Sequence, residues 1–141
     1  MMRYLIAVLA LAGAVVSGLA LQVHYSTATQ PCSINEHWDC GVVNHSPFAM
    51  VGSVPVAAIG IAGYLALAAL ALLGWRFALL VTAFAAFCFA LRLTFIEEFE
   101  LQVWCLYCVI SQGIIALIML LSVGWLAAEH LALKRAAKRI G

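Results

Sequence analysis

Four long apolar runs constrain this chain more than any other feature of its sequence. They cover residues 4–23, 54–73, 77–96 and 104–125. Each holds about 20 residues, and at about 1.5 Å of rise per residue this is enough for a helix to cross the hydrocarbon core of a bilayer. None alternates with period two as a barrel strand does, so the runs predict helices, whose backbone groups are satisfied within the segment. We expect an all-α integral membrane protein, a four-transmembrane-helix bundle that forms one domain over residues 1–141.

The composition agrees with this expectation and excludes other classes. Of 141 residues, 67% are hydrophobic and only 9% are charged, far from the average of soluble domains. The formal net charge is +1, and no basic patch adjoins an aromatic surface, so nothing indicates nucleic-acid binding. The expected surroundings are the lipid bilayer.

Charged side chains divide between the two ends of the predicted bundle. The positive ones beside the termini are Arg3, Arg76, Lys134, Arg135, Lys138 and Arg139. The acidic ones at the opposite end are Glu36, Asp39, Glu97, Glu98 and Glu100. Because lysine and arginine mark the cytoplasmic side, we expect both termini in the cytoplasm and the opposite end outside the cell membrane, where disulfides persist.

The first run allows a second interpretation, a cleaved signal peptide. Small residues from Ser17 to Ala20 are compatible with a cleavage site. Cleavage would leave three helices and would put the basic tail on the wrong side relative to the acidic loops. We therefore expect the first run to be a membrane span.

The outer loop, residues 24–53, is the only long polar segment. Within it, Ser46 and Pro47 predict an N-cap followed by proline in the first helical position, opening a short helix through Met50. Apolar residues around this helix suggest that it lies in the membrane interface as a lid over the helix ends. The segment from Gly52 to Pro55 then restarts the chain into the second span.

The chain has five cysteines, and four of them fall into two pairs. Cys32 and Cys40 lie in the outer loop, and Cys105 and Cys108 lie at the head of the last span. Residues three apart on a helix share a face, so Cys105 and Cys108 can form a disulfide and reopen it. We expect Cys105 in the first helical turn, where the helix dipole favours a thiolate, and as the more exposed sulfur of the two. The fifth, Cys88, lies mid-membrane on the third span and is expected to be inert.

Three interpretations of the two pairs remain open. A four-cysteine metal site is one, although the wide Cys32–Cys40 spacing is not that of a tight zinc knuckle. A non-enzymatic protein with a structural loop disulfide is the second. The third is a relay in which an outside thiol protein reduces the loop pair, the loop pair reduces Cys105–Cys108, and Cys108 passes the electrons to a membrane quinone, ubiquinone or menaquinone. The relay alone explains a disulfide within one helix, which would constrain almost nothing.

Several further residues are candidates for contact with a quinone. They are Ser111, Gln112, Phe48, Val51 and Pro55. The alternatives are a bond from Ser111 to its own helix backbone, an interhelical bond for Gln112, and lid packing for the other three.

Other polar side chains at the outer end are expected to be solvated or to lie at the membrane interface. His37 and His45 are candidates for proton transfer, but loop histidines are more often solvated. Arg92 is expected to reach toward Glu97 or the interface.

The chain resembles the vitamin K epoxide reductase family in its bacterial branch, and the resemblance covers nearly the whole chain. The matching residues are Cys32 and Cys40, Ser46-Pro47-Phe48-Ala49, Gly52-Ser53-Val54-Pro55-Val56, Gly60, Gly63, Tyr64, Trp104-Cys105-Leu106-Tyr107-Cys108 and Ser111.

The resemblance implies a four-helix bundle around a quinone, with Cys105 and Cys108 as the active pair and Cys32 and Cys40 as the shuttle. It implies that the protein reoxidises an extracytoplasmic thioredoxin-like disulfide-forming protein. Some members carry this partner fused at the C-terminus. Here the sequence ends in a basic tail, so we expect the partner to be a separate chain. The epoxide specificity of the mammalian branch is not carried over.

Overall fold

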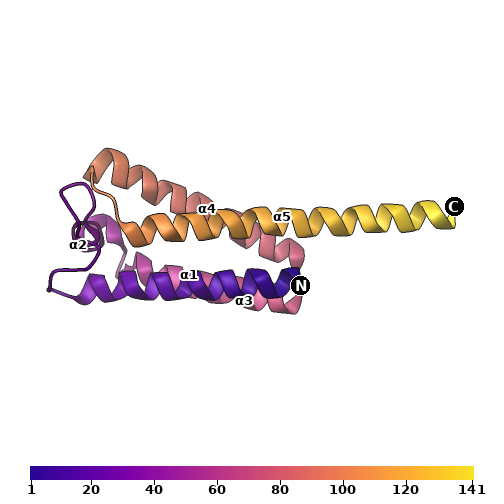
Figure 1. The fold of residues 1–141 in the computed structure, drawn as a ribbon, viewed down its shortest axis with the longest axis horizontal. Helices are drawn as coiled ribbons and strands as arrows, with labels where there is room; N and C mark the ends of the chain where they lie inside the picture. The colour runs from indigo at the N-terminus through magenta and orange to yellow at the C-terminus, as the bar shows by residue number, and fades with distance from the viewer.

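The computed structural model describes residues 1–141 and contains four long helices, each apolar enough to cross a membrane. They are α1 (Met2–Tyr25), α3 (Val56–Leu73), α4 (Arg76–Ile96) and α5 (Leu106–Ile140). Figure 1 shows both termini at one end of the bundle and the segment between α1 and α3 at the other, which we call the loop end. The expected all-α bundle is confirmed, and the protein is a multi-pass membrane protein.

The last helix is longer than its apolar run. We expected it to end near Trp125 with a short basic tail after Glu129, but α5 continues to Ile140. Its final turns are rich in Ala, Leu, Lys and Arg, which are strong helix formers and extend the helix beyond the apolar segment. At 35 residues it measures about 50 Å, more than the hydrocarbon core requires, and its end projects alone beyond the other helices (Figure 1).

The helices pack in the order α3, α1, α5, α4. α1 lies along both α3 and α5, and α5 also lies along α4, whereas α3 and α4 touch over a shorter stretch. The core between them is apolar, with Ile6, Leu67, Leu79 and Ile118 fully buried. Many other large apolar side chains, such as Val8 and Phe84, face outward, as lipid-facing residues do.

Small residues allow α1 and α3 to approach closely. A Cβ atom at Gly13 would collide with the ring of Tyr64, and one at Gly60 would lie 2.8 Å from the hydroxyl oxygen of Ser17. Gly63 has open space beside it instead, and it lines the cavity described below. The small residues of the second span therefore serve both helix packing and an internal opening.

The loop end contains more structure than the sequence suggested. A helix that we did not predict, α2 (Cys40–His45), is capped by Asp39, whose carboxylate accepts from the backbone N–H groups of Gly41 and Val42. The predicted helix from Pro47 through Met50 is a single 3₁₀ turn, η1 (Pro47–Ala49), and Met50 already belongs to a strand. The Ser46 hydroxyl does not cap it but donates to the carbonyl of Val43. Because α2 already takes up residues 40–45, only a few residues remain between its end and strand β1, which is enough for a single 3₁₀ turn.

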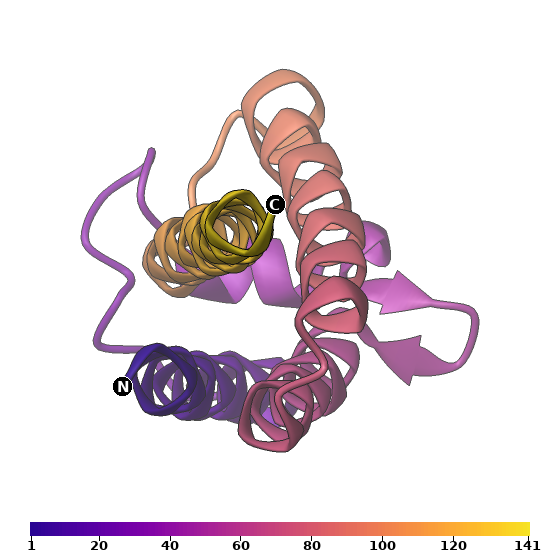
Figure 2. The same cartoon turned by 90° about the vertical axis from the view of Figure 1, so that its right-hand side faces the viewer.

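A small hairpin follows and leads into the second span. Strand β1 (Met50–Val51) pairs antiparallel with β2 (Val54–Pro55), and Gly52 takes a positive φ of 62° in the turn between them. The hairpin projects from the side of the bundle in Figure 2.

The connection between α4 and α5 lies against the outer loop. α4 continues into one π-helical stretch, η2 (Glu97–Leu101), and the chain then reverses at Gln102 with a φ of 54°. The extended residues that follow pair with the loop: the backbone of Trp104 donates to His37 O at 2.7 Å and accepts from Asp39 N at 3.0 Å. This bridge holds the segment before Cys105 beside the segment before Cys40.

Candidate redox site

Four of the five cysteines gather at the loop end. Cys32 and Cys40 are joined by a disulfide with their Cα atoms 5.7 Å apart. Both are buried in one small apolar cluster that also contains Cys105. Cys105 and Cys108 are free thiols, and Cys88 lies apart from them on the outer face of α4. The structure therefore places one cysteine of the second pair in the same buried cluster as the bonded first pair.

Cys105 differs from our expectation in two respects. It does not lie in the first helical turn but immediately before it, as the extended N-cap residue of α5, with φ −101° and ψ 121°. It is also not the more exposed sulfur, because Cys105 is 0% exposed whereas Cys108 is partly exposed. The reason is α2, which covers Cys105 at the loop end and leaves Cys108 facing the interior of the bundle.

A buried asparagine links Cys105 to the loop. The side-chain amide of Asn44 donates to the carbonyl of Cys40 at 2.9 Å and to Sγ of Cys105 at 3.5 Å. Its own backbone carbonyl accepts from Nδ1 of His24 at 2.6 Å, which fixes α2 against the end of α1. Asn44 therefore holds the two cysteines in one hydrogen-bonded group.

The environment of Cys105 favours its thiolate. A hydrogen bond from the Cys108 thiol lowers the pKa of the Cys105 thiol, although burial opposes part of this effect. The position before the first turn of α5 adds the favourable end of the helix dipole. Since the thiolate is the reactive form in thiol–disulfide exchange, Cys105 is prepared to react with a disulfide beside it.

The carboxylate of Asp39 supports the loop at the start of α2. The Ser33 hydroxyl donates to it at 2.8 Å, and this bond, with the two backbone donors of α2, keeps the pKa of Asp39 below its usual value. The carboxylate ties the residues after Cys32 to the residue before Cys40. It thereby fixes the loop that the disulfide closes.

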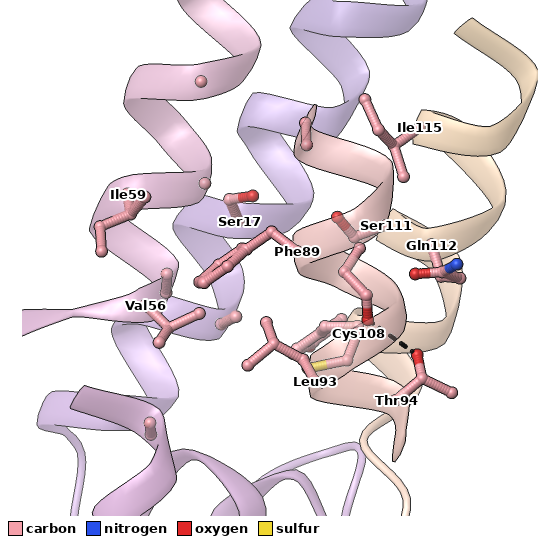
Figure 3. A pocket seen from close by; sticks show the side chains of 18 of the residues that line it. Ser17, Val56, Ile59, Phe89, Leu93, Thr94, Cys108, Ser111, Gln112 and Ile115 are labelled. Atoms are coloured by element: carbon pink, nitrogen blue, oxygen red, sulfur yellow. Dashed lines mark hydrogen bonds between the residues drawn. The ribbon is translucent and has the colours of Figure 1, made fainter. Parts of the chain in front are cut away.

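A cavity of about 370 Å³ lies inside the bundle beside Cys108. Its walls are mostly apolar and come from all four long helices and from the residues after α2. In Figure 3, Val56 and Ile59 of α3 lie on one side of it, and Cys108, Ser111 and Gln112 of α5 lie on the other. A pocket of this size and composition is typical of sites for small apolar ligands that carry a few polar groups.

The structure separates the five predicted quinone contacts into two groups. Ser111, Gln112 and Phe48 line the cavity. Val51 and Pro55 do not: Val51 is half exposed on the hairpin, and Pro55 is buried where β2 joins α3. The strand pairing turns both of these residues away from the cavity, which the sequence pattern did not indicate.

Two polar residues of the cavity have different hydrogen-bond states. Ser111 does not simply bond its own helix, because its hydroxyl and its carbonyl each lie 2.8 Å from the hydroxyl of Tyr64. The side-chain oxygen of Gln112 is buried with no hydrogen-bond partner. An unpaired buried oxygen is costly, so it marks a position where a bound donor would be stabilised.

Two predicted residues lie outside this group. His37 and His45 are both exposed and line no part of the cavity.

One acidic residue that we did not single out lies inside the site. Glu97 is 3% exposed and accepts a hydrogen bond from Cys105 N at 3.2 Å. Arg92 makes no ion pair with it, contrary to one of our expectations. Nothing in the sequence distinguishes Glu97 from Glu98 and Glu100, because only the π-helical stretch decides which of the three turns inward.

The metal interpretation gains no support from the geometry. Cys32 and Cys40 are bonded to each other, and no group of three or more His, Cys, Asp or Glu side chains is arranged to hold a metal ion.

Comparison with known proteins assigns the chain to a family. Residues 4–123 match the model of the vitamin K epoxide reductase family, so the match covers nearly all of the first three membrane helices, the first half of α5 and both cysteine pairs. A search of curated proteins gave no match. The chain therefore belongs to the vitamin K epoxide reductase family and is a membrane-embedded oxidoreductase.

Proposed function

We propose that this protein is a quinone-linked thiol oxidase that reoxidises a separate, extracytoplasmic thioredoxin-like disulfide-forming protein. The observation that carries the proposal is the position of Cys105 and Cys108. Cys105 lies in one buried cluster with the loop disulfide, and Cys108 lines an apolar cavity within the bundle. The two pairs and the cavity form a continuous path for two electrons.

The first exchange oxidises the partner. A thiolate of the reduced partner attacks one sulfur of the Cys32–Cys40 disulfide, and the second partner thiolate displaces that sulfur from the mixed disulfide. The partner leaves with a new disulfide, and the loop keeps two thiols. Because Cys32 and Cys40 are 3% and 0% exposed, the loop must open toward the partner for this step.

The second exchange carries the electrons inward. A loop thiolate attacks Sγ of Cys105 in the oxidised Cys105–Cys108 pair and expels the Cys108 thiolate, which takes up the proton that the loop thiol lost. The other loop thiolate then restores the loop disulfide and leaves Cys105 as a thiolate. We assign the attack to Cys40, because the Asn44 amide contacts both the Cys40 carbonyl and the Cys105 sulfur.

The residues around the cavity fit a quinone. The walls suit an apolar ring and tail. The Gln112 amide, one turn after Cys108, can donate an N–H to a quinone carbonyl, and its unpaired oxygen can accept from a hydroxyl of the quinol product. When bound, a quinone accepts two electrons and two protons. Phe48, Ser111 and Gln112 would hold the ring, and Ser46 and Ala49 line the cavity beside Phe48 at the loop end. Ubiquinone and menaquinone both fit this description.

We infer that the loop end faces outward from the cell membrane. The cationic residues of α5 all lie near its C-terminal end, at the opposite side from the cysteines. The bias of lysine and arginine then places both termini in the cytoplasm and the loop disulfide where disulfides persist.

Quinone reduction by the purified protein tests this proposal. The protein in detergent is mixed with a reduced thioredoxin-like protein and a short-chain ubiquinone or menaquinone, and the quinone absorbance is followed. We expect turnover in the wild type, no turnover in C105S or C108S, and unchanged turnover in C88S, the matched control. Full turnover in C105S or C108S would contradict the relay. A folded wild type that reduces no quinone would favour the alternative, a non-enzymatic membrane protein with a structural disulfide.

A further inference from the structure

Glu97 is a buried acidic residue that the relay described above does not use. It begins η2 at the end of α4, and its side chain is 3% exposed, whereas Glu98 and Glu100 on the same stretch are exposed. The only ion pair of the structure joins Arg76 to Glu129 at the opposite end, so Glu97 has no cationic partner. A buried carboxylate without a cation is strongly unfavourable, and such a residue is a candidate for function.

The surroundings of Glu97 connect it to both sulfurs and to the cavity. Its Oε2 accepts from the backbone N–H of Cys105 at 3.2 Å. Its carboxyl group lies beside the Cys108 thiol, and both residues line the cavity. No other acidic or basic side chain lines this cavity.

The titratable groups facing Glu97 are few. They are Cys105, just before α5, and Cys108 on α5, and Tyr107 of the same helix also lines the cavity. On its own helix, Arg92 is exposed, and His24 at the end of α1 is occupied by its bond to Asn44. Besides the Cys105 thiolate, which gives up its electrons in the reaction, Glu97 is therefore the one ionisable acceptor beside the Cys108 thiol.

We propose that Glu97 is the general base that takes the proton of the Cys108 thiol and delivers it to the electron acceptor in the cavity. This rests on the proposed function. In the reduced pair, the S–H bond of Cys108 breaks and an O–H bond forms on Glu97, while the electron pair stays on sulfur. Oxidation then closes the Cys105–Cys108 disulfide, two electrons pass to the quinone, and Glu97 gives up its proton to the quinone oxygen. Because Cys105 is already a thiolate in the reduced pair, the second proton of the quinol comes from water, and Glu97 returns to its ionised form.

A purely structural role predicts a different result on substitution. The hydrogen bond from Cys105 N needs only an acceptor oxygen, and a glutamine amide at position 97 supplies one. The variant E97Q therefore keeps the structural contact and loses only the ionisable group. E98Q, which changes the exposed neighbour on the same stretch, is the matched control.

The test follows the two halves of the reaction with dithiothreitol as electron donor and a short-chain ubiquinone as acceptor. In E97Q we expect Cys105 and Cys108 to be reduced normally, as shown by maleimide labelling, and the quinone to be reduced at least about 100-fold more slowly. We also expect the pH dependence of the wild-type rate to be lost. E98Q should match the wild type. If quinone reduction in E97Q slows by less than tenfold, the proposal is overturned. It is also overturned if E97Q keeps the pH dependence of the wild type, however slow its reaction is.

The folded state is controlled by thermal unfolding of each variant. If E97Q unfolds at lower temperature, E97D decides: a retained carboxyl should give quinone reduction within about tenfold of wild type with its pH dependence, and loss of both would overturn the proposal. A wild type that reduces no quinone would instead refute the proposed function, so the two failures are distinguishable.

Discussion

The thiolate of Cys105 depends on a hydrogen bond from Cys108, and removing that donor should move the titration of Cys105 to higher pH. The matched variants are C108A, which removes the donor, and C108S, which replaces the thiol with a hydroxyl donor. Both are made in protein whose other cysteines, Cys32, Cys40 and Cys88, are serine, so that Cys105 is the only thiol. The bond from Cys108 is the largest of the effects that lower the pKa of Cys105.

The size of the shift follows from the strength of one bond to a charged group. Such bonds contribute about 1.5–3 kcal/mol, and the lower value, about 1.5 kcal/mol, sets the smallest difference to expect between the serine hydroxyl donor of C108S and the alanine of C108A. One pH unit corresponds to about 1.4 kcal/mol. The ultraviolet absorbance of the thiolate should therefore appear about one pH unit higher in C108A than in C108S. Equal midpoints, or a lower midpoint in C108A, would refute the assignment of Cys108 as the donor.

Three further predictions concern the loop, the helix packing and the cavity. D39A removes the cap of α2, which should cost about 1 kcal/mol and speed reduction of the loop disulfide by dithiothreitol up to about fivefold. Because the Ser33 hydroxyl lowers the pKa of Asp39 on folding, the wild-type loop should keep this stabilisation above the ordinary carboxyl pKa and lose it as the pH falls through the lower folded value. The thermal unfolding temperatures of the wild type and D39A should then converge at acid pH, and a difference that does not change with pH would contradict this. G13A should push the Tyr64 ring aside and destabilise the protein by about 1–3 kcal/mol in thermal unfolding, whereas G18A, with open space at its Cβ, should not; equal effects would contradict the packing. Q112L should raise the KM for quinone about tenfold and leave reduction by dithiothreitol unchanged, and an unaltered KM would remove Gln112 from the binding site.

The sequence predicts the features that depend on composition and spacing along the chain. Long apolar runs are sufficient to identify the four spans, because a lipid environment leaves helices as the only solution for such segments. The spacing of Cys105 and Cys108 and their position at a span terminus place them together at the loop end. Because Cys108 lies one turn into the last span, its position also predicts a site for a lipid-soluble ligand beside it.

Features that depend on contacts between distant segments could not be predicted in the same way. The burial of Cys105 results from the backbone bridge between Trp38 and Trp104, which no local pattern encodes. The choice of Glu97 as the inward glutamate depends on the π-helical stretch, which shifts the face of the helix. Asn44 reads as an ordinary loop residue until α2 places its amide between two cysteines.

The most direct test of the electron path is the disulfide that forms between the two pairs. In C32S/C108S protein, only Cys40, Cys88 and Cys105 remain. Cys40 has lost its disulfide partner Cys32, and Cys105 has lost its partner Cys108. Mild oxidation followed by mass spectrometry of the peptides should find Cys40 joined to Cys105, and far less of a Cys32–Cys105 bond in the matched C40S/C108S protein. If Cys40 and Cys105 stay unpaired, the two cysteine pairs do not exchange electrons in the way that we propose.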